Sequence, residues 1–233
     1  MSRERILSTL HTSLASSRPW LEAEAAKVPH APPPYVLPPA DDLPAQFVAE
    51  LTKLEGKPYL VASHTEALAI IARLLDERQA RQLLAWDLDQ LELPGLAALL
   101  TQRGITLLAP SVRGDTRQAQ LQTLDLAPVC LSGVTCAIAE SGSLALRHGP
   151  GRPRLASLLA PTHIAVVRAD QIVRGLGDFF AYMHGAYGAD IFTQTSNLTL
   201  ISGPSRTADI EMTLSLGIHG PPELHVVLLM GAA

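Results

Sequence analysis

Cysteine, aromatic residues and charge are all scarce in this chain, and each shortage argues against a class of function. Only Cys130 and Cys136 occur among its 233 residues, so it lacks the cysteine sets that hold zinc or an iron–sulfur cluster. Charged residues make up 17% and the net charge is −4, which argues against a nucleic-acid partner. No apolar run is long enough to cross a membrane. We therefore expect a cytoplasmic protein without a metal or cluster, whose two thiols are buried and free.

Three common sequence signatures are also missing. G-x-G-x-x-G, the P-loop and G-x-S-x-G do not occur in the chain. Nicotinamide-dependent, ATP-hydrolysing and serine-hydrolase functions therefore lack their usual sequence support.

Strand-like and helix-like segments alternate along most of the chain. A helix is expected over 3–16, and the seven prolines of 29–44 predict an extended arm, because proline is excluded from helix interiors and central strands. The expected strands are 58–62, 83–86, 105–109, 129–139, 143–146, 163–168, 198–202 and 224–230. Their alternation with helices predicts an α/β fold with a mainly parallel sheet covered by helices. We expect an N-terminal helix and arm over 1–44 and an α/β domain over 45–233.

Chemically versatile residues are concentrated in the segment 201–211. They are Gly203, Pro204, Ser205, Arg206, Thr207, Asp209 and Glu211. Glycine and proline end regular structure here. The hydroxyls and the guanidinium offer hydrogen-bond donors at what we expect to be the start of a helix. Such donors at a helix start suit a small anion. The alternative is purely structural: a turn followed by a capped helix whose carboxylates complement the helix dipole.

Three parts of the chain together resemble the lactate utilization protein C family, which is built on the LUD domain. They are 133–135 with 137–143, then 157–167, and then 201–211 with 217–221 and 224–226. The resemblance implies a fold similar to the ribose-5-phosphate isomerase, glucosamine-phosphate deaminase and CoA transferase group. It also implies a role in oxidising L-lactate to pyruvate beside two partner proteins that carry the iron–sulfur cysteines. One departure is that Cys136 alone separates Thr135 from Ala137, where the family has several more residues, including an acidic one.

The segment 208–218 is predicted to be helical although its pattern is that of a strand. Apolar and polar residues alternate strictly from Ala208 to Ile218. We expect a helix because the two buried strands that flank it need a crossover, and because of the family resemblance.

Glu140 and His219 are the candidate catalytic residues. Glu140 precedes Ser141 and Gly142 at an expected strand end, and a glutamate in a similar setting is the nucleophile of CoA transferases. A tight turn with a solvated Glu140 is the alternative. His219 lies in a loop and is a candidate general base, whereas His163, at the start of a strand, is more typical of a structural histidine.

We expect a cluster-free subunit of a lactate-oxidation system, whose 203–207 loop binds a small organic acid or a phosphate-bearing ligand beside Glu140 and His219. Ser141, Gly142 and Asp209 are expected to contribute to ligand binding. Two alternatives remain open: a non-catalytic assembly or regulatory subunit, and a CoA transferase-like or sugar-phosphate isomerase-like enzyme.

Overall fold

A computed structural model describes residues 2–27, 33–38, 40–108, 110, 112, 114–188, 195, 197–208 and 214–231. The chain divides into two compact units, Met1–Pro33 and Pro34–Ala233. The first unit holds helix α1, Arg3–Ala25, which begins where the side chain of Ser2 accepts the backbone N–H of Arg5. This helix extends well beyond the predicted 3–16. Its apolar residues Ile6, Leu10 and Leu14 are exposed.

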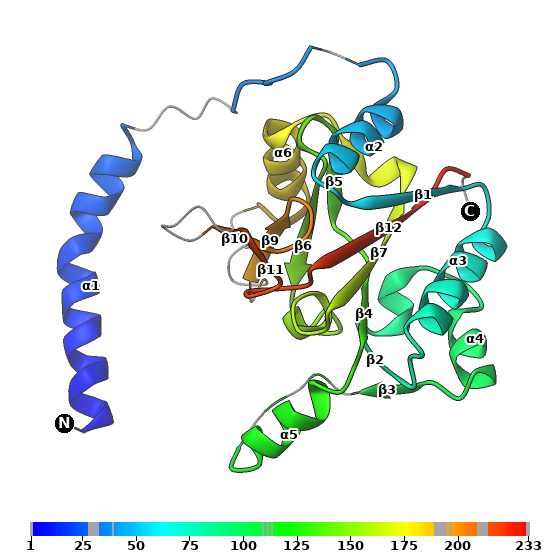
Figure 1. Ribbon diagram of the computed structural model, residues 1–233. Coiled ribbons are helices and arrows are strands. Elements are labelled where there is room, and N and C mark those ends of the chain that lie inside the picture. Colours follow the sequence, from blue (N-terminus) through cyan, green and yellow to red (C-terminus); the bar gives the residue numbers. More distant parts are fainter. Residues whose placement is uncertain are drawn as a thin grey trace. The chain divides into compact units, whose positions relative to one another are not determined.

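The second unit is built on a six-stranded, fully parallel sheet (Figure 1). Its strand order is β1-β12-β7-β4-β2-β3. The strands are β1 Lys57–Val61, β12 Glu223–Leu229, β7 Thr162–Arg168, β4 Val129–Ser132, β2 Gln82–Ala85 and β3 Thr106–Leu108. The predicted α/β fold with a mainly parallel sheet is confirmed.

A second sheet and several helices cover the main sheet. Helices α3 (His64–Glu77) and α4 (Leu96–Gln102) lie on one face, and a four-stranded sheet lies on the other (Figure 1). The order in that sheet is β8-β5-β6-β9. Its strands are β5 Cys136–Ile138, β6 Ser143–His148, β8 Ile172–Val173 and β9 Asn197–Ile201, and helix α6 Leu176–Tyr187 covers its outer side.

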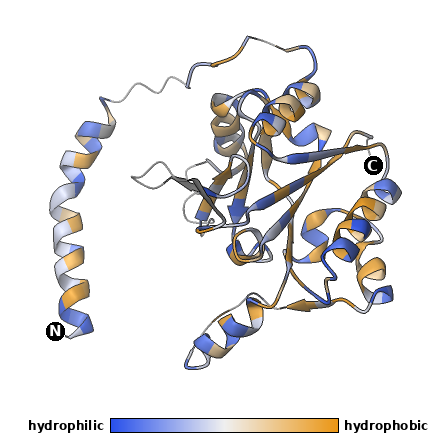
Figure 2. Ribbon diagram, viewed as in Figure 1, coloured by the Kyte–Doolittle hydropathy of each residue, from blue (hydrophilic) through white to orange (hydrophobic). Residues whose placement is uncertain are grey.

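Alternation along the second sheet creates two cores. Ala137, Leu144 and Leu146 belong to the large core shared with the main sheet, whereas Cys136 and Ala145 belong to a small core with α6. Successive strand residues point to opposite faces, so apolar residues at every position bury both faces of β5 and β6. In contrast to these strands, the surface helices mix apolar and polar residues along their length (Figure 2).

Helix α2, Leu43–Lys53, begins inside the proline-rich segment that was expected to be an arm. Asp42 caps it by accepting the N–H of Ala45, and Pro44 lies in its first turn. Proline is tolerated there because the first helical N–H groups have no partner within the helix. The expectation that the arm runs unbroken to residue 44 is therefore wrong. Helix α5, Arg117–Leu124, was also not predicted.

Two further predictions are corrected. The single strand expected over 129–139 is two strands, β4 in the main sheet and β5 in the second, separated by 133–135. The helix expected over 208–218 is instead an antiparallel hairpin, β10 Arg206–Ala208 and β11 Leu214–Leu216, with 209–213 outside the described residues. The crossover argument fails because β9 and β12 belong to different sheets. The alternation had indicated a strand, and Ala208 and Leu214–Leu216 of this segment lie in strands.

Among the helices of the described residues, none combines the length and the apolar character needed to traverse a lipid bilayer.

Candidate functional site

The 203–206 loop and His219 meet at one cavity of about 260 Å³, which we call the β9 cavity. It lies beside the end of β9 and near the amino-terminal ends of β7 and β12, where His163 and Leu224 line it. The polar residues that line it are Ser157, His163, Thr199, Ser202, Ser205, Arg206 and His219. Segments more than fifty residues apart in the sequence therefore contribute to one cavity.

Backbone hydrogen bonds hold two loops together at the rim of the β9 cavity. The N–H of Ser205 donates to the carbonyl of Pro221 at 2.8 Å, and the N–H of Gly217 donates to the carbonyl of Ser205 at 3.0 Å. Gly203 has a φ of 84°, and a Cβ there would lie 2.7 Å from the carbonyl oxygen of Leu54. Glycine is required at this position by both conformation and space.

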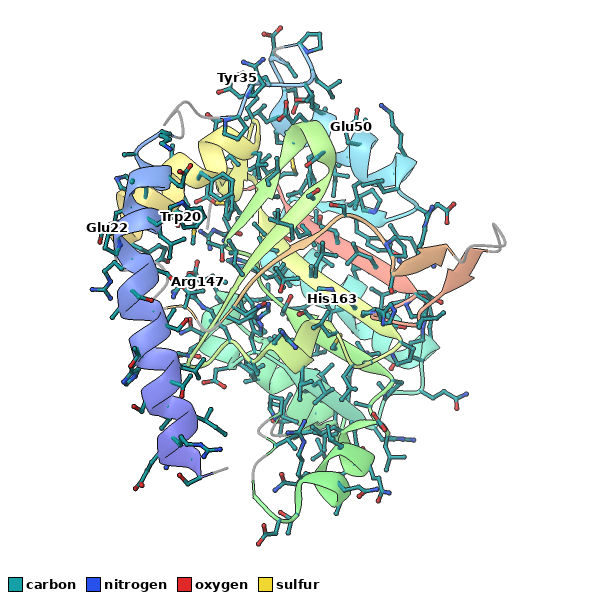
Figure 3. The ribbon with its side chains drawn as sticks, turned by 90° about the vertical axis from the view of Figure 1, so that its left-hand side faces the viewer. Trp20, Glu22, Tyr35, Glu50, Arg147 and His163 are labelled. Carbon is teal, nitrogen blue, oxygen red and sulfur yellow. The ribbon has the colours of Figure 1, made fainter. Side chains whose placement is uncertain are left out.

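His163 is a buried, neutral imidazole in the interior of the second unit (Figure 3). Burial, with smaller effects of His148 and His225, lowers its pKa to about 3. Its Nε2 is hydrogen bonded to the hydroxyl of Ser132 at 2.8 Å. Ser132 is fully buried and does not line the cavity, so this pair does not present a nucleophile to a ligand. The hydrogen bond with Ser132 instead fixes the orientation of the imidazole ring of His163, the histidine that we expected to be structural.

Arg206 is the cation of the β9 cavity. Its Nη2 donates to the carbonyl of Leu54 at 2.9 Å and forms an ion pair of 2.8 Å with Glu55. The Glu55 side chain is 69% exposed, so water screens this pair and makes it weak. A guanidinium has five N–H donors in a planar fork, which leaves Arg206 donors for an oxyanion as well.

Glu140 does not line the β9 cavity. Its carboxylate Oε2 accepts the backbone N–H of Val36 at 2.9 Å, and the side chain is buried. Arg174, which stacks on Tyr35 with its Cζ 3.6 Å from the ring centroid, donates to the carbonyl of Leu37 at 3.2 Å. Figure 3 shows Tyr35, whose hydroxyl donates to Asp178 of α6 at 2.8 Å. Glu140 therefore holds the 35–37 segment against the domain, and this geometry gives no support to nucleophilic attack.

Ser141 and Gly142 connect only indirectly with the β9 cavity. Exposed Ser141 donates to the hydroxyl of Ser143 at 2.9 Å, and Ser143 is hydrogen bonded to Ser202 of the cavity wall at 2.6 Å. Gly142 ends the 3-10 helix η2, Ala139–Ser141. Ser141 thus supports the wall through a chain of hydroxyl groups, whereas Gly142 has only a conformational role in the turn.

The remaining predicted ligand-binding residues are only partly described. Pro204 lines the β9 cavity, and Thr207 is described only as a backbone position on β10. Asp209 lies outside the described residues. Because β10 is a strand, no helix dipole stands behind the loop, and hydrogen-bond donors alone must attract an anion.

A second cavity, of about 140 Å³, was not expected from the sequence; we call it the strand-end cavity. It lies at the carboxyl-terminal ends of β2, β4 and β7, and its lining includes Gln90, Thr135, Arg152, Arg168, Gln171 and Tyr182. The available signal was Gly133, directly after β4, and Arg168, the last residue of β7. Arg152 and Tyr182 carry no such signal, because they come from a turn and from α6.

The described residues contain no cluster of three or more His, Cys, Asp or Glu side chains placed to hold a metal ion. Both cysteines are buried and free, as predicted. Burial raises the pKa of Cys130 to about 12 and that of Cys136 to about 11, so both remain thiols at neutral pH.

Comparison with known proteins gives a consistent result. The family model described as LUD domain matches residues 44–229. A protein named lactate utilization protein C from Deinococcus radiodurans is 30% identical, with 96% of this chain and 93% of that protein aligned. The lactate utilization protein C of Halalkalibacterium halodurans is 31% identical over 65% of this chain.

The chain spans less than two thirds of some of these relatives. It covers 64% of the Halalkalibacterium halodurans protein and 41% of an uncharacterized protein of Neisseria meningitidis, to which it is 34% identical. Among solved structures, the crystal structure of a DUF162 family protein from Deinococcus radiodurans matches with a TM-score of 0.57 and 26% identity, covering 82% of this chain and 99% of that one.

Proposed function

Because this chain belongs to the LUD domain family, we propose that it takes part in lactate utilization as a subunit without an iron–sulfur cluster, and that its β9 cavity binds a small organic acid or a phosphate-bearing ligand. The proposal draws on relatives named lactate utilization protein C, of which one aligns over nearly the whole chain.

One observation carries the assignment of the β9 cavity. Its lining comes largely from the segments 157–167, 201–211 and 217–221, which also carry the family resemblance. Arg206 offers charge-assisted donors, Ser202 and Ser205 offer hydroxyls, and the neutral ring of His163 adds a hydrogen-bonding group without a charge. Such a set suits the recognition of a carboxylate or phosphate.

The partners of this chain are proposed from its resemblance to the lactate utilization protein C family. Oxidation of a 2-hydroxy acid releases two electrons, and the two free thiols of this chain cannot hold a cluster to carry them. The resemblance implies partner proteins with iron–sulfur clusters, and we propose that these partners carry the electrons.

The first prediction concerns Arg206. Arg206→Ala should weaken binding of the responsive anion by about tenfold or more, because a hydrogen bond to a charged group contributes about 1.5–3 kcal/mol. Titration calorimetry with L-lactate, pyruvate, inorganic phosphate and CoA measures this. Glu55→Ala is the matched control, because it removes the ion pair of Arg206 and keeps the guanidinium. If Glu55→Ala weakens binding as much as Arg206→Ala does, the role of Arg206 is structural.

A cellular experiment tests the function itself. A strain that lacks this gene should fail to grow on L-lactate as sole carbon source and should recover with the wild-type gene or with Glu55→Ala. Recovery with Arg206→Ala would remove the β9 cavity from the function. Unimpaired growth of the deletion strain on L-lactate would reject the role in lactate utilization.

A second role, assembly with another protein, is favoured by α1. This helix forms a unit of its own, and its residues Leu10, Leu14 and Trp20 are 51–63% exposed. Large apolar side chains gathered on a separate helix are typical of protein contacts.

A further inference from the structure

The strand-end cavity occupies the position at which open α/β sheets most often bind ligands. β4 lies between β2 and β7 in the sheet, and Trp86, Gly133 and Arg168 stand at the carboxyl-terminal ends of these three strands. The chain leaves β2 toward the edge strand β3, whereas it leaves β4 toward the second sheet and β7, on the other side. Divergent connections open a crevice at such a switch point.

Arg152 is a cation without a carboxylate partner at this cavity. Its Nε donates to the side-chain oxygen of Gln90 at 2.9 Å, and its Cζ lies 5.7 Å from the centroid of the Trp86 ring. Within the described ranges, no acidic group lies within 4.0 Å of its guanidinium. Arg168 differs, because it pairs with Glu92 and with Asp170. Arg152 is thus held in place while its terminal N–H groups stay available to line the cavity.

The walls around Arg152 are fixed by hydrogen bonds. Thr135 Oγ1 accepts the backbone N–H of Arg147 at 3.0 Å. Gln171 accepts the N–H of Arg168 at 2.9 Å and donates to the carbonyl of Val134 at 3.0 Å. A site whose donors are oriented before binding loses little entropy when the ligand arrives.

Tyr182 of α6 adds a hydroxyl group to the same cavity. Burial and the nearby Cys136 and Tyr187 raise its pKa, against the opposing charges of Arg152 and Arg147. The phenol is therefore protonated at neutral pH and can donate a hydrogen bond to an acceptor on a ligand.

The size of the cavity limits what it can hold. Its volume of about 140 Å³ is smaller than the 260 Å³ of the β9 cavity. Space at Gly133 is already tight, since a Cβ there would lie 3.3 Å from the carbonyl oxygen of Gln90 and 3.4 Å from the Trp86 ring. We therefore expect this cavity to bind a small ligand and not one of nucleotide size such as CoA.

We propose that the strand-end cavity is a second binding site, separate from the β9 cavity, for a small oxyanion gripped by Arg152: a short carboxylate or inorganic phosphate. The guanidinium fork of Arg152 matches the two oxygens of either group, and Thr135, Gln171 and Tyr182 surround the rest of the ligand with polar groups.

Tryptophan fluorescence can report on this site directly. The chain has two tryptophans, and Trp86 lines the cavity while Trp20 belongs to α1. In a Trp20→Phe protein, emission comes from Trp86 alone. We expect a saturable change of this emission on titration with L-lactate, pyruvate or inorganic phosphate, and the anion that binds most tightly distinguishes a carboxylate site from a phosphate site. No saturable change with any of the three up to about 10 mM would overturn the proposal.

Variants in the Trp20→Phe background test the role of Arg152. Arg152→Ala should raise the Kd at least about tenfold, and Arg152→Lys, which keeps the charge and loses the fork, should lie in between. Arg154→Ala is the matched control, because Arg154 is a nearby exposed arginine that does not line this cavity. An unchanged Kd in Arg152→Ala would overturn the proposal. Should Arg152→Ala fail to fold, Tyr182→Phe removes only one hydroxyl, and its unchanged Kd would count against the site.

Two further titrations separate this site from the β9 cavity. Arg206→Ala should leave the Trp86 titration unchanged, so a failure of the β9 cavity and a failure of the strand-end cavity give different results. CoA should produce no Trp86 response that depends on Arg152, and such a response would overturn the size limit.

Discussion

Gly142 ends η2 with a φ of 58° and lies against the backbone of α2. A Cβ at this position would come within 2.4 Å of the backbone nitrogen of Leu51. Backbone atoms cannot move aside as the end of a side chain can. The Glu-Ser-Gly turn, which drew attention as a candidate catalytic element, therefore has a structural requirement for glycine that is independent of any ligand.

The second prediction belongs to this residue. Gly142→Ala should lower the free energy of unfolding by about 2–4 kcal/mol, because it adds left-handed strain and a clash with α2. Gly185→Ala is the matched control, since Gly185 lies in α6 with no atom within 4 Å of the added Cβ. We expect it to raise stability by about 0.5–1 kcal/mol. Urea denaturation measures both, and equal effects of the two substitutions would contradict the packing argument.

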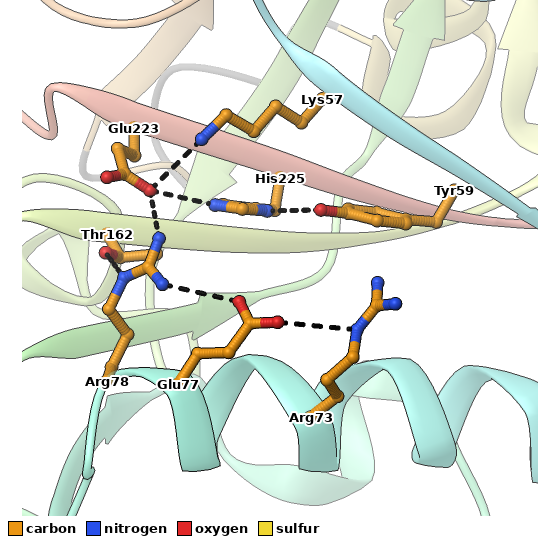
Figure 4. Close-up of polar contacts among 8 residues, drawn as sticks. All are labelled: Lys57, Tyr59, Arg73, Glu77, Arg78, Thr162, Glu223 and His225. Carbon is orange, nitrogen blue, oxygen red and sulfur yellow. Dashed lines mark hydrogen bonds and ion pairs between the residues drawn. The ribbon is translucent and has the colours of Figure 1, made fainter.

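At the scale of elements, a polar network joins β12 to β1 and α3 (Figure 4). Glu223 pairs with Arg78 and with Lys57, and accepts from His225 Nε2 at 3.1 Å. His225 Nδ1 lies 2.9 Å from the hydroxyl of Tyr59. Burial lowers the pKa of His225 despite Glu223, so the neutral ring donates from Nε2 and accepts at Nδ1. The network fixes the start of β12, next to the β9 cavity.

The third prediction concerns the contribution of Glu223 to the pH dependence of stability. Burial alone would raise its pKa, but the hydrogen bonds from His225 and Arg78 and the charges of Arg78 and Lys57 lower it from 4.5 to about 2. The pKa of Glu223 is lower in the folded than in the unfolded protein. Its contribution to stability is therefore complete above pH 4.5 and is lost as the pH falls toward 2.

Glu223→Gln should therefore reduce the loss of stability between pH 4.5 and about 2. Denaturation at several pH values in this range measures the free energy of unfolding. The control is Glu4→Gln, which makes the same change of net charge on α1. An unchanged pH profile in Glu223→Gln would show that the network does not depend on this charge.

The hairpin β10–β11 shows what pattern and topology each contribute to an element. Alternation over 208–218 indicated a strand, as found for Ala208 and Leu214–Leu216, but an argument from the chain crossover favoured a helix. That argument assumed one sheet, but β9 pairs with β6 in the second sheet, and β12 lies between β1 and β7 in the first. Hydrophobic periodicity is therefore the better guide to secondary structure as long as it is unknown which sheet each flanking strand joins.

At the scale of the whole molecule, the two units divide at residues 33 and 34. Tyr35, Val36 and Leu37 belong to the second unit and are hydrogen bonded there to Asp178, Glu140 and Arg174. The domain boundary expected at residue 44 remains a prediction. The structure suggests that a truncation should spare 35–37.

The fourth prediction compares two truncations. Deletion of 1–33 should leave the thermal midpoint unchanged and weaken association with partner proteins, if α1 serves assembly. Deletion of 1–42 should lower the midpoint by about 5 °C, because it removes the 35–37 contacts and the Asp42 cap of α2. Calorimetry checks both. A large loss of stability after deletion of 1–33 would show that α1 is required by the domain.

Sequence alone determined the features that depend on neighbouring residues. Continuous apolar runs such as those of β7 and β12 identified the buried strands, because burial of both faces leaves a local trace in the sequence. The alternation in 208–218 indicated a strand, although a helix was predicted there. The scarcity of cysteine excluded a cluster-bearing chain without any structure. Gly203 and His219 were selected as neighbours by their place in loops, and both line the β9 cavity.

Tertiary structure alone decided which loops meet. The fold placed Glu140 against Val36 instead of in the β9 cavity with Arg206. Strand order gathered Arg152, Thr135 and Gln171 at the ends of three strands. These contacts arise from pairing between strands distant in sequence, which leaves no periodic trace near any one residue. The chain's chemistry is thus encoded locally, whereas the sites are created by the arrangement of its two sheets.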